Sequence, residues 1–229
     1  MKLLFPAADA GAKKPTILTP AQGRALQAEK GLTILQEKGI IKAITVDDVI
    51  KAGIKGEGTD SIIREDVAKA IIDTITSAKK AGGKFDFDDV RLVSISPKEG
   101  EGLEVFRTNA VDRYGYPHVI LEINEYAVGG LTKEQADLLF FMAENTACNS
   151  VEDGILHEIG HAKVIYGRTY ANYERISDEL EEKHIEGVSV LAKKDGLECI
   201  AECEVRLKHG VKIPKEAREL YELYTSGGG

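Results

Sequence analysis

Apolar residues change their spacing along the chain, and these changes predict the order of its elements. Before residue 82 the apolar positions recur with helical periodicity. Between residues 90 and 124 they form short runs, the clearest of them close to the period of two that is typical of strands. The helical periodicity then returns. The pattern therefore predicts an α+β fold in which a small mixed sheet lies between a helical N-terminal part and a helical C-terminal part.

The same periodicity places the individual elements. Helices are expected at residues 21–38, at 45–50, from 59 or 60 to about 80, at 132–147 and after Ser150; strands are expected at 90–95, 103–107 and 118–124, with a turn at 112–117. The spacing of apolar residues changes from helical to strand-like after Gly82 and Gly83. We therefore expect residues 1–84 to form an N-terminal arm and helical part, and residues 85–229 to form a second domain.

Composition and charge exclude several classes of protein. The chain has 229 residues, of which 43% are hydrophobic and 30% charged, and this is the range of a globular protein with its own core. The formal net charge of −8 argues against a nucleic-acid-binding surface, and no partner of that class is expected. Trp is absent and aromatic residues make up 6%, so platforms for stacking single-stranded bases are scarce.

No membrane or export signal is evident. No apolar run approaches the roughly 20 residues that span a bilayer, and the run that starts at Met1 ends at Pro6 and meets Asp9 too early for a signal peptide. The three cysteines, at positions 148, 199 and 203, form no CxxC pair. We therefore expect reduced, buried thiols and a cytoplasmic location.

One motif carries metal chemistry. His157-Glu158-Ile159-Gly160-His161 is an HExxH sequence. On a helix, residues four apart lie on one face, so both imidazoles can contact one Zn²⁺. Glu158 lies beside the metal without being a ligand, and it can accept a proton from the metal-bound water.

The flanking residues predict a helix around this motif. Ser150 is the expected N-cap and Gly167 the expected C-terminal stop. Gly154 lies one turn before His157, where a bulky side chain could crowd the metal. The alternative, in which the two histidines are ordinary residues of a helix face, is less consistent with these small and apolar neighbours.

A catalytic zinc needs a third protein ligand. His184 and His209 lie downstream, but neither follows the HExxHxxGxxH spacing, because Val164 and Gly167 occupy the key positions. A Glu on a later helix is the better candidate.

Glu198 and Glu202 share one face of that later helix. Glu198 is the first candidate ligand, although with Asp195 it also forms a D-x-x-E pattern that could cap the helix start. Glu202 is either a residue that orients a His ligand or the ligand itself. Cys199 and Cys203 flank this acidic face and are interpreted as core residues.

The two segments together resemble a known family. His157-Glu158-Ile159-Gly160-His161-Ala162 followed by Glu198-x-x-Ala201-Glu202 is similar to the HExxHA…ExxAE signature of gluzincin-type, zincin-like metallopeptidases related to anthrax lethal factor and the Pro-Pro endopeptidases. Zincin-like domains of this type also occur in bacteriophage structural proteins. The resemblance covers about residues 115–210. It implies a zincin-like core within residues 85–229, with Zn²⁺ held by His157, His161 and Glu198, and with Glu202 in a supporting position.

The chain departs from this family at one point. Its members often carry a Tyr shortly before ExxAE that assists the oxyanion, whereas residues 188–194 contain none. Tyr166, Tyr170 and Tyr173 follow the HExxH segment and are candidates for this assistance, although packing is the ordinary role of such residues.

Two functions are therefore expected as alternatives. The first is a zinc-dependent metallopeptidase that acts on a peptide or protein substrate, with Glu158 as general base and with the strand at residues 118–124 as an edge along which the substrate pairs. The second is a structural component of a larger assembly such as a phage particle, located in the virion, with a zincin fold and little or no turnover. The N-terminal hundred residues, which exceed what a catalytic core needs, motivate this second hypothesis.

Overall fold

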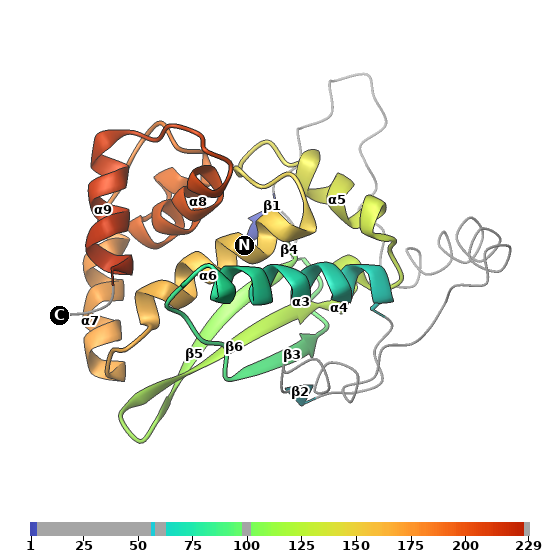
Figure 1. Ribbon diagram of the computed structural model, residues 1–229, viewed down its shortest axis with the longest axis horizontal. Coiled ribbons are helices and arrows are strands. Elements are labelled where there is room, and N and C mark those ends of the chain that lie inside the picture. The colour runs from blue at the N-terminus through green and yellow to red at the C-terminus, as the bar shows by residue number, and fades with distance from the viewer. Residues whose placement is uncertain (4–55, 58–62, 98–101, 227–229) are drawn as a thin grey trace, which may run out of the picture.

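The computed structural model describes residues 1–3, 56–57, 63–97 and 102–226, and these residues form an α+β fold (Figure 1). This confirms the predicted fold class at the level of a mixed sheet combined with helices. The helices predicted at 21–38 and 45–50 lie outside the described residues, as does the predicted start of the helix at 59 or 60. The division of the chain at residue 84 stays a prediction.

The main sheet of the described residues has four strands. In spatial order they are β2 (Gly56–Glu57), β3 (Asp89–Val93), β6 (Tyr116–Asn124) and β5 (Phe106–Arg113). β3 runs parallel to both β2 and β6, whereas β5 and β6 form an antiparallel hairpin. The prediction that residues 118–124 form an edge strand is therefore wrong: β6 is central, and β5 lies at the edge.

The hairpin turn is tighter than the predicted turn at 112–117. β5 continues to Arg113 and β6 begins at Tyr116, so only two residues connect the strands. Tyr114 and Gly115 both have positive φ angles, of 58° and 86°, which matches the twist that a two-residue hairpin requires.

A second sheet of two short strands continues the edge that β5 forms. β1 (Lys2–Leu3) pairs antiparallel with β4 (Leu103–Glu104), which directly precedes β5 along the chain. The predicted strand at 103–107 is therefore divided between β4 and β5. Residues 1–3 thus lie beside a strand that is distant from them in sequence.

Helices cover one face of the sheet and form a second layer beyond it. The helices are α3 (Glu65–Lys80), α4 (Glu125–Val128), α5 (Lys133–Phe141), α6 (Val151–Ile165), α7 (Tyr170–Glu181), the 3₁₀ turn Leu191–Lys193, α8 (Gly196–Lys208) and α9 (Lys215–Thr225). α6 packs on β5 and β6, and α3 lies beside α6 (Figure 1). α3, α6 and the sheet share one core, while α7, α8 and α9 enclose a second apolar cluster.

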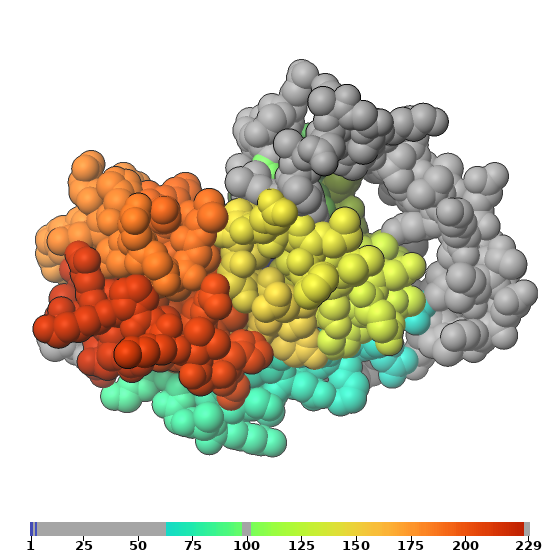
Figure 2. All heavy atoms as spheres, turned by 90° about the horizontal axis from the view of Figure 1, so that it is seen from above, coloured from blue at the N-terminus to red at the C-terminus, as the bar shows by residue number. Residues whose placement is uncertain are grey.

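The helix predicted at 132–147 ends earlier than expected. Thr132 and Gln135 form the predicted capping box, but α5 stops at Phe141. The following irregular segment passes beside α8, where Ala147 and Thr146 bond to a carboxylate of that helix. These tertiary contacts replace the last turns of the predicted helix. Figure 2 shows this yellow part of the chain packed directly against the red C-terminal helices.

Among the described residues, no helix is both long and apolar enough to cross a membrane.

Candidate metal centre

α6 is the buried helix that carries the HExxH residues. Ser150 caps its N-terminus by accepting a hydrogen bond from the backbone N–H of Asp153, and Gly167, with a φ of +72°, follows its C-terminus, as predicted. Ile155 and Ile159 are fully buried on this helix. This packing holds His157 in the interior, where none of its surface is exposed.

Gly154 has a different role from the one predicted. A Cβ atom at this position would lie 2.6 Å from Cε1 of Phe140 and 3.0 Å from Cδ2 of Phe106. The small residue therefore makes room for two aromatic rings of the core. The expectation that Gly154 clears space for a metal is corrected accordingly.

Three ligand atoms converge between α6 and α8. Nε2 of His157 lies 3.2 Å from Nε2 of His161 and 3.1 Å from Oε2 of Glu198, and the distance from Nε2 of His161 to Oε2 of Glu198 is 3.9 Å. In a tetrahedral zinc site with bonds of 2.0–2.1 Å, ligand atoms are separated by about 3.3 Å. The three distances thus bracket the separation that a shared Zn²⁺ requires.

The Glu198 carboxylate fits a metal better than it fits the protein alone. Its Oε2 atom is buried, and no described residue donates a well-aligned hydrogen bond to it. Burial would raise the pKa of this carboxyl, but the His157 and His161 imidazoles hold it well below its usual value, so the group stays ionised. A buried, ionised oxygen that points at two imidazole nitrogens is the donor that a divalent cation would satisfy.

Asp195, and not the Glu198 side chain, caps the N-terminus of α8. The Asp195 side chain caps α8 by accepting a hydrogen bond from the backbone N–H of Glu198 at 2.8 Å. Glu198 thus gives its backbone to the cap and leaves its carboxylate free for the histidines.

Glu202 lies on the opposite side of the His157 ring. Its Oε1 is 2.8 Å from Nδ1 of His157, and it also accepts hydrogen bonds from the Thr146 hydroxyl and the Ala147 backbone N–H. These bonds fix the orientation of the imidazole and direct Nε2 toward Glu198 and His161. Glu202 is therefore a hydrogen-bond partner of the His157 ring and is not among the three converging atoms.

A second set of ligand-type side chains shares His157. Cys148, His157 and Glu202 also lie close enough to hold an ion. Burial and the Glu202 carboxylate raise the pKa of the Cys148 thiol to about 12, so this sulfur stays protonated at neutral pH. Because metals bind thiolates, and because Glu202 is already hydrogen-bonded, this set is a polar network that supports His157. Cys148, Cys199 and Cys203 are all free and buried, as predicted.

Glu158 is fully buried and points toward the sheet edge. Its Oε2 accepts a hydrogen bond of 2.6 Å from the backbone N–H of Thr108, and its Oε1 lies 3.1 Å from the α-amino nitrogen of Met1. Burial would raise the pKa of Glu158, but the Met1 ammonium and the two imidazoles of the motif lower it. The carboxylate is therefore ionised and held against β5.

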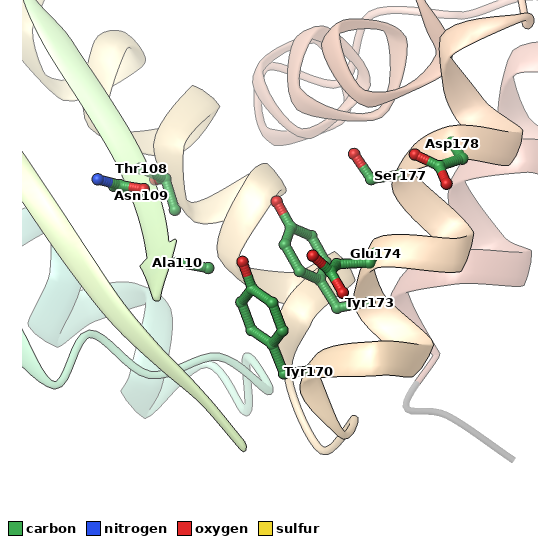
Figure 3. Close-up of a pocket in the computed structure, with 8 residues that line it drawn as sticks. All are labelled: Thr108, Asn109, Ala110, Tyr170, Tyr173, Glu174, Ser177 and Asp178. Atoms are coloured by element: carbon green, nitrogen blue, oxygen red, sulfur yellow. The ribbon is translucent and has the colours of Figure 1, made fainter. Parts of the chain in front are cut away.

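A cavity adjoins this edge. It has a volume of about 490 Å³ and lies between β5 and α7 (Figure 3); it is lined by Thr108, Asn109, Ala110, Tyr170, Tyr173, Glu174, Ser177 and Asp178. The rings of Tyr170 and Tyr173 point from α7 toward the strand (Figure 3). Neither tyrosine hydrogen-bonds to a residue of the HExxH motif or to Glu198, so their assistance to an oxyanion stays a prediction.

Two residues that contact Glu158 could not be predicted from the sequence. Met1 and Thr108 both bond to Glu158, and neither belongs to a motif. Met1 is held by a bond to Phe106, 105 positions away, and Thr108 meets Glu158 because β5 packs against α6, 50 positions further along the chain. The alternation of apolar residues near 103–107 predicted a strand there but not which helix residue it would face.

No known protein family, curated protein or solved structure matches this chain. The functional argument therefore depends on the geometry of the site.

Proposed function

We propose that this chain is a zinc-dependent metallopeptidase with a zincin-like core, in which His157, His161 and Glu198 hold the ion. The observation that carries the proposal is the convergence of two imidazole nitrogens on one buried carboxylate oxygen of Glu198. With three protein ligands, a tetrahedral site keeps one position open, and this is the arrangement of catalytic zinc sites.

The chemistry divides between the ion and the protein. A bound Zn²⁺ supplies Lewis acidity, which polarises a carbonyl and lowers the pKa of water. Glu158 accepts a proton from the attacking water and later donates it to the leaving amine. In the metal-free chain the Met1 ammonium and the two imidazoles keep this carboxylate ionised, which is the protonation state that a general base requires. Glu202 keeps the His157 ring oriented during this cycle.

The sheet edge suits an extended peptide. β5 is the edge strand of the four-stranded sheet, and its residues 108–110 line the cavity beside α7. A peptide that adds to this edge gains backbone hydrogen bonds. It also lies beside Glu158, because Thr108 of the edge strand donates its backbone N–H to that carboxylate. The substrate strand proposed from the sequence is therefore reassigned from residues 118–124 to β5.

The experiment measures zinc and turnover in the same preparation. We expect one zinc per chain by metal analysis, and cleavage of a peptide library that stops with a chelator and returns when zinc is added. Absence of bound zinc at neutral pH would contradict the proposal. Stoichiometric zinc without turnover would instead favour the alternative role as a structural component of a larger particle.

A further inference from the structure

The α-amino group of Met1 lies at the general base. Its nitrogen donates a hydrogen bond of 2.6 Å to the carbonyl oxygen of Phe106 and lies 3.1 Å from Oε1 of Glu158. The ammonium–carboxylate pair is completely buried. Burial lowers the pKa of this amine, but Glu158 and Glu198 together raise it above its ordinary value, so it is charged.

The residues that follow Met1 lie along the sheet edge like a bound peptide. The carbonyl oxygen of Met1 accepts a hydrogen bond from the N–H of Val105, and Lys2 and Leu3 then pair antiparallel with β4. The side chains of Met1 and Leu3 are buried in the core, with exposed fractions of 6% and 0%. An apolar side chain therefore fills the position beside the base.

The direction of this segment continues into the cavity. Residues 1–3 run antiparallel to β4, and Lys2 pairs with Glu104. In that register the two residues placed before Met1 would face Phe106 and Arg107, and the third to fifth would face Thr108, Asn109 and Ala110 at the cavity. The edge thus has an occupied half, covered by residues 1–3, and an open half at the cavity. Glu158 lies between the two halves, since Met1 and Thr108 hold its two oxygens.

We propose that residues 1–3 occupy the product half of the substrate groove, with Met1 in the position of the residue that follows the scissile bond. This inference rests on the proposed peptidase function and names its substrate class. The groove accepts an extended peptide with a bulky apolar residue directly after the scissile bond, and residues 1–3 compete with it.

The reaction that matches this geometry is hydrolysis of a bond to the Met1 nitrogen in a chain extended before Met1. Water adds to the carbonyl carbon of the preceding residue, and Glu158 takes the proton that the water loses. The C–N bond then breaks as Glu158 passes its proton to the Met1 nitrogen, which gives a neutral amine and a carboxylic acid. The acid gives up its proton and the amine takes up one, so the products are a carboxylate and an ammonium that pairs with the ionised Glu158 and donates to the Phe106 carbonyl.

The open half favours a basic side chain. Glu174 and Asp178 line the cavity from α7, and neither forms an ion pair with another described residue. Two carboxylates without a counter-charge attract Arg or Lys, and the Tyr170 and Tyr173 rings of the same wall suit a guanidinium. Peptides with Arg at the third and fourth residues before the scissile bond should therefore be preferred.

The first experiment extends the full chain with Met-Arg-Arg-Ala-Ala before Met1 and follows its intact mass. With zinc, we expect removal of the extension to leave Met1 as the first residue, and no removal in the Glu158→Gln variant. A Met-Glu-Glu-Ala-Ala extension should be removed roughly three- to fivefold more slowly, as expected for partly exposed charges. Glu174→Gln combined with Asp178→Asn should abolish that difference.

These outcomes separate the inference from the proposed function. If the chain binds zinc and cleaves library peptides but leaves the extension intact, or cuts it elsewhere, the assignment of residues 1–3 is wrong while the peptidase stands. If the chain binds no zinc, both proposals fail together.

The second experiment needs no activity. In the metal-free full chain, reductive methylation should label the Met1 amine at least tenfold more slowly than Lys215, whose side chain is 89% exposed. The competing peptide acetyl-Arg-Arg-Ala-Ala-Met-Arg-Leu-amide, which contains no amine, should accelerate labelling of Met1 by displacing it. The same peptide with Glu in place of Met should not. Equal labelling of Met1 and Lys215, or no effect of the first peptide, would overturn the assignment.

Discussion

Gly160 of α6 faces Ala201 of α8 at a close contact between the two helices. A Cβ atom on Gly160 would lie 2.6 Å from the Cα atom of Ala201, which is backbone and cannot rotate away. Gly160 lies between the two histidines of the motif, and Ala201 lies between Glu198 and Glu202. The close approach of these two small residues therefore sets the distance across which the imidazoles meet the carboxylates.

Gly160→Ala should separate the two helices and weaken zinc binding. We expect a loss of about 1–3 kcal/mol in the free energy of unfolding, as for other overpacked interiors, together with a lower zinc affinity. Gly154→Ala is the matched control on the same helix, because its Cβ meets the Phe140 ring instead of α8. That variant should lose stability by denaturant unfolding but keep its zinc affinity. Equal zinc affinity in both variants would contradict this account.

Glu198→Gln should remove a metal ligand. A neutral amide binds Zn²⁺ poorly, so we expect the affinity to fall by more than about 100-fold in a competition titration with a chromophoric chelator. Glu204→Gln is the control on the same helix, because its carboxylate pairs with Lys163 and Tyr221 away from the histidines. If both variants hold zinc as tightly as the unmodified chain, Glu198 is not a ligand.

Glu202→Gln should weaken zinc binding to a smaller extent. The carboxylate orients His157 through Nδ1, and loss of such a partner lowers metal affinity by about 10–100-fold. Full occupancy should return at high zinc concentration, unlike in Glu198→Gln. A variant that cannot be saturated would make Glu202 a ligand instead of an orienting residue.

Glu158→Gln should retain zinc and lose turnover. General-base catalysis contributes about 10²–10⁴-fold, so kcat should fall by that factor while the metal content stays at one per chain. The variant also leaves the buried Met1 ammonium without its counter-charge, and its melting temperature should be lower for that reason. Turnover within threefold of the unmodified chain would exclude Glu158 as the base.

Zinc binding should release a proton and strengthen as the pH rises. Burial lowers the pKa of His157, but the neighbouring Cys148 thiol and the Glu198 and Glu202 carboxylates raise it well above its ordinary value, so the metal-free imidazole is protonated at neutral pH. A zinc ligand must be a neutral imidazole, and each increase in pH below that pKa removes competing protons. Calorimetry in two buffers of different ionisation enthalpy should detect about one proton per zinc. An affinity that does not change between about pH 6 and about pH 8 would contradict this prediction.

The sequence alone determined the local part of this site. Residues four apart on a helix share a face in any protein, and the caps at Ser150 and Asp195 depend on neighbours within one turn. The helix that carries the histidines and the one that carries Glu198 were therefore predictable from spacing and end signals, as was the presence of a mixed sheet.

Only the tertiary structure decided what meets at Glu158. Alternation of apolar residues predicts a strand but not its neighbours, so the sequence could not place β5 at the edge and β6 at the centre. Likewise, nothing near Met1 indicates that its amine pairs with a carboxylate 157 positions away. Such contacts arise when separate apolar faces pack into one core, because the energy of burial depends on the area covered and not on where along the chain that area lies.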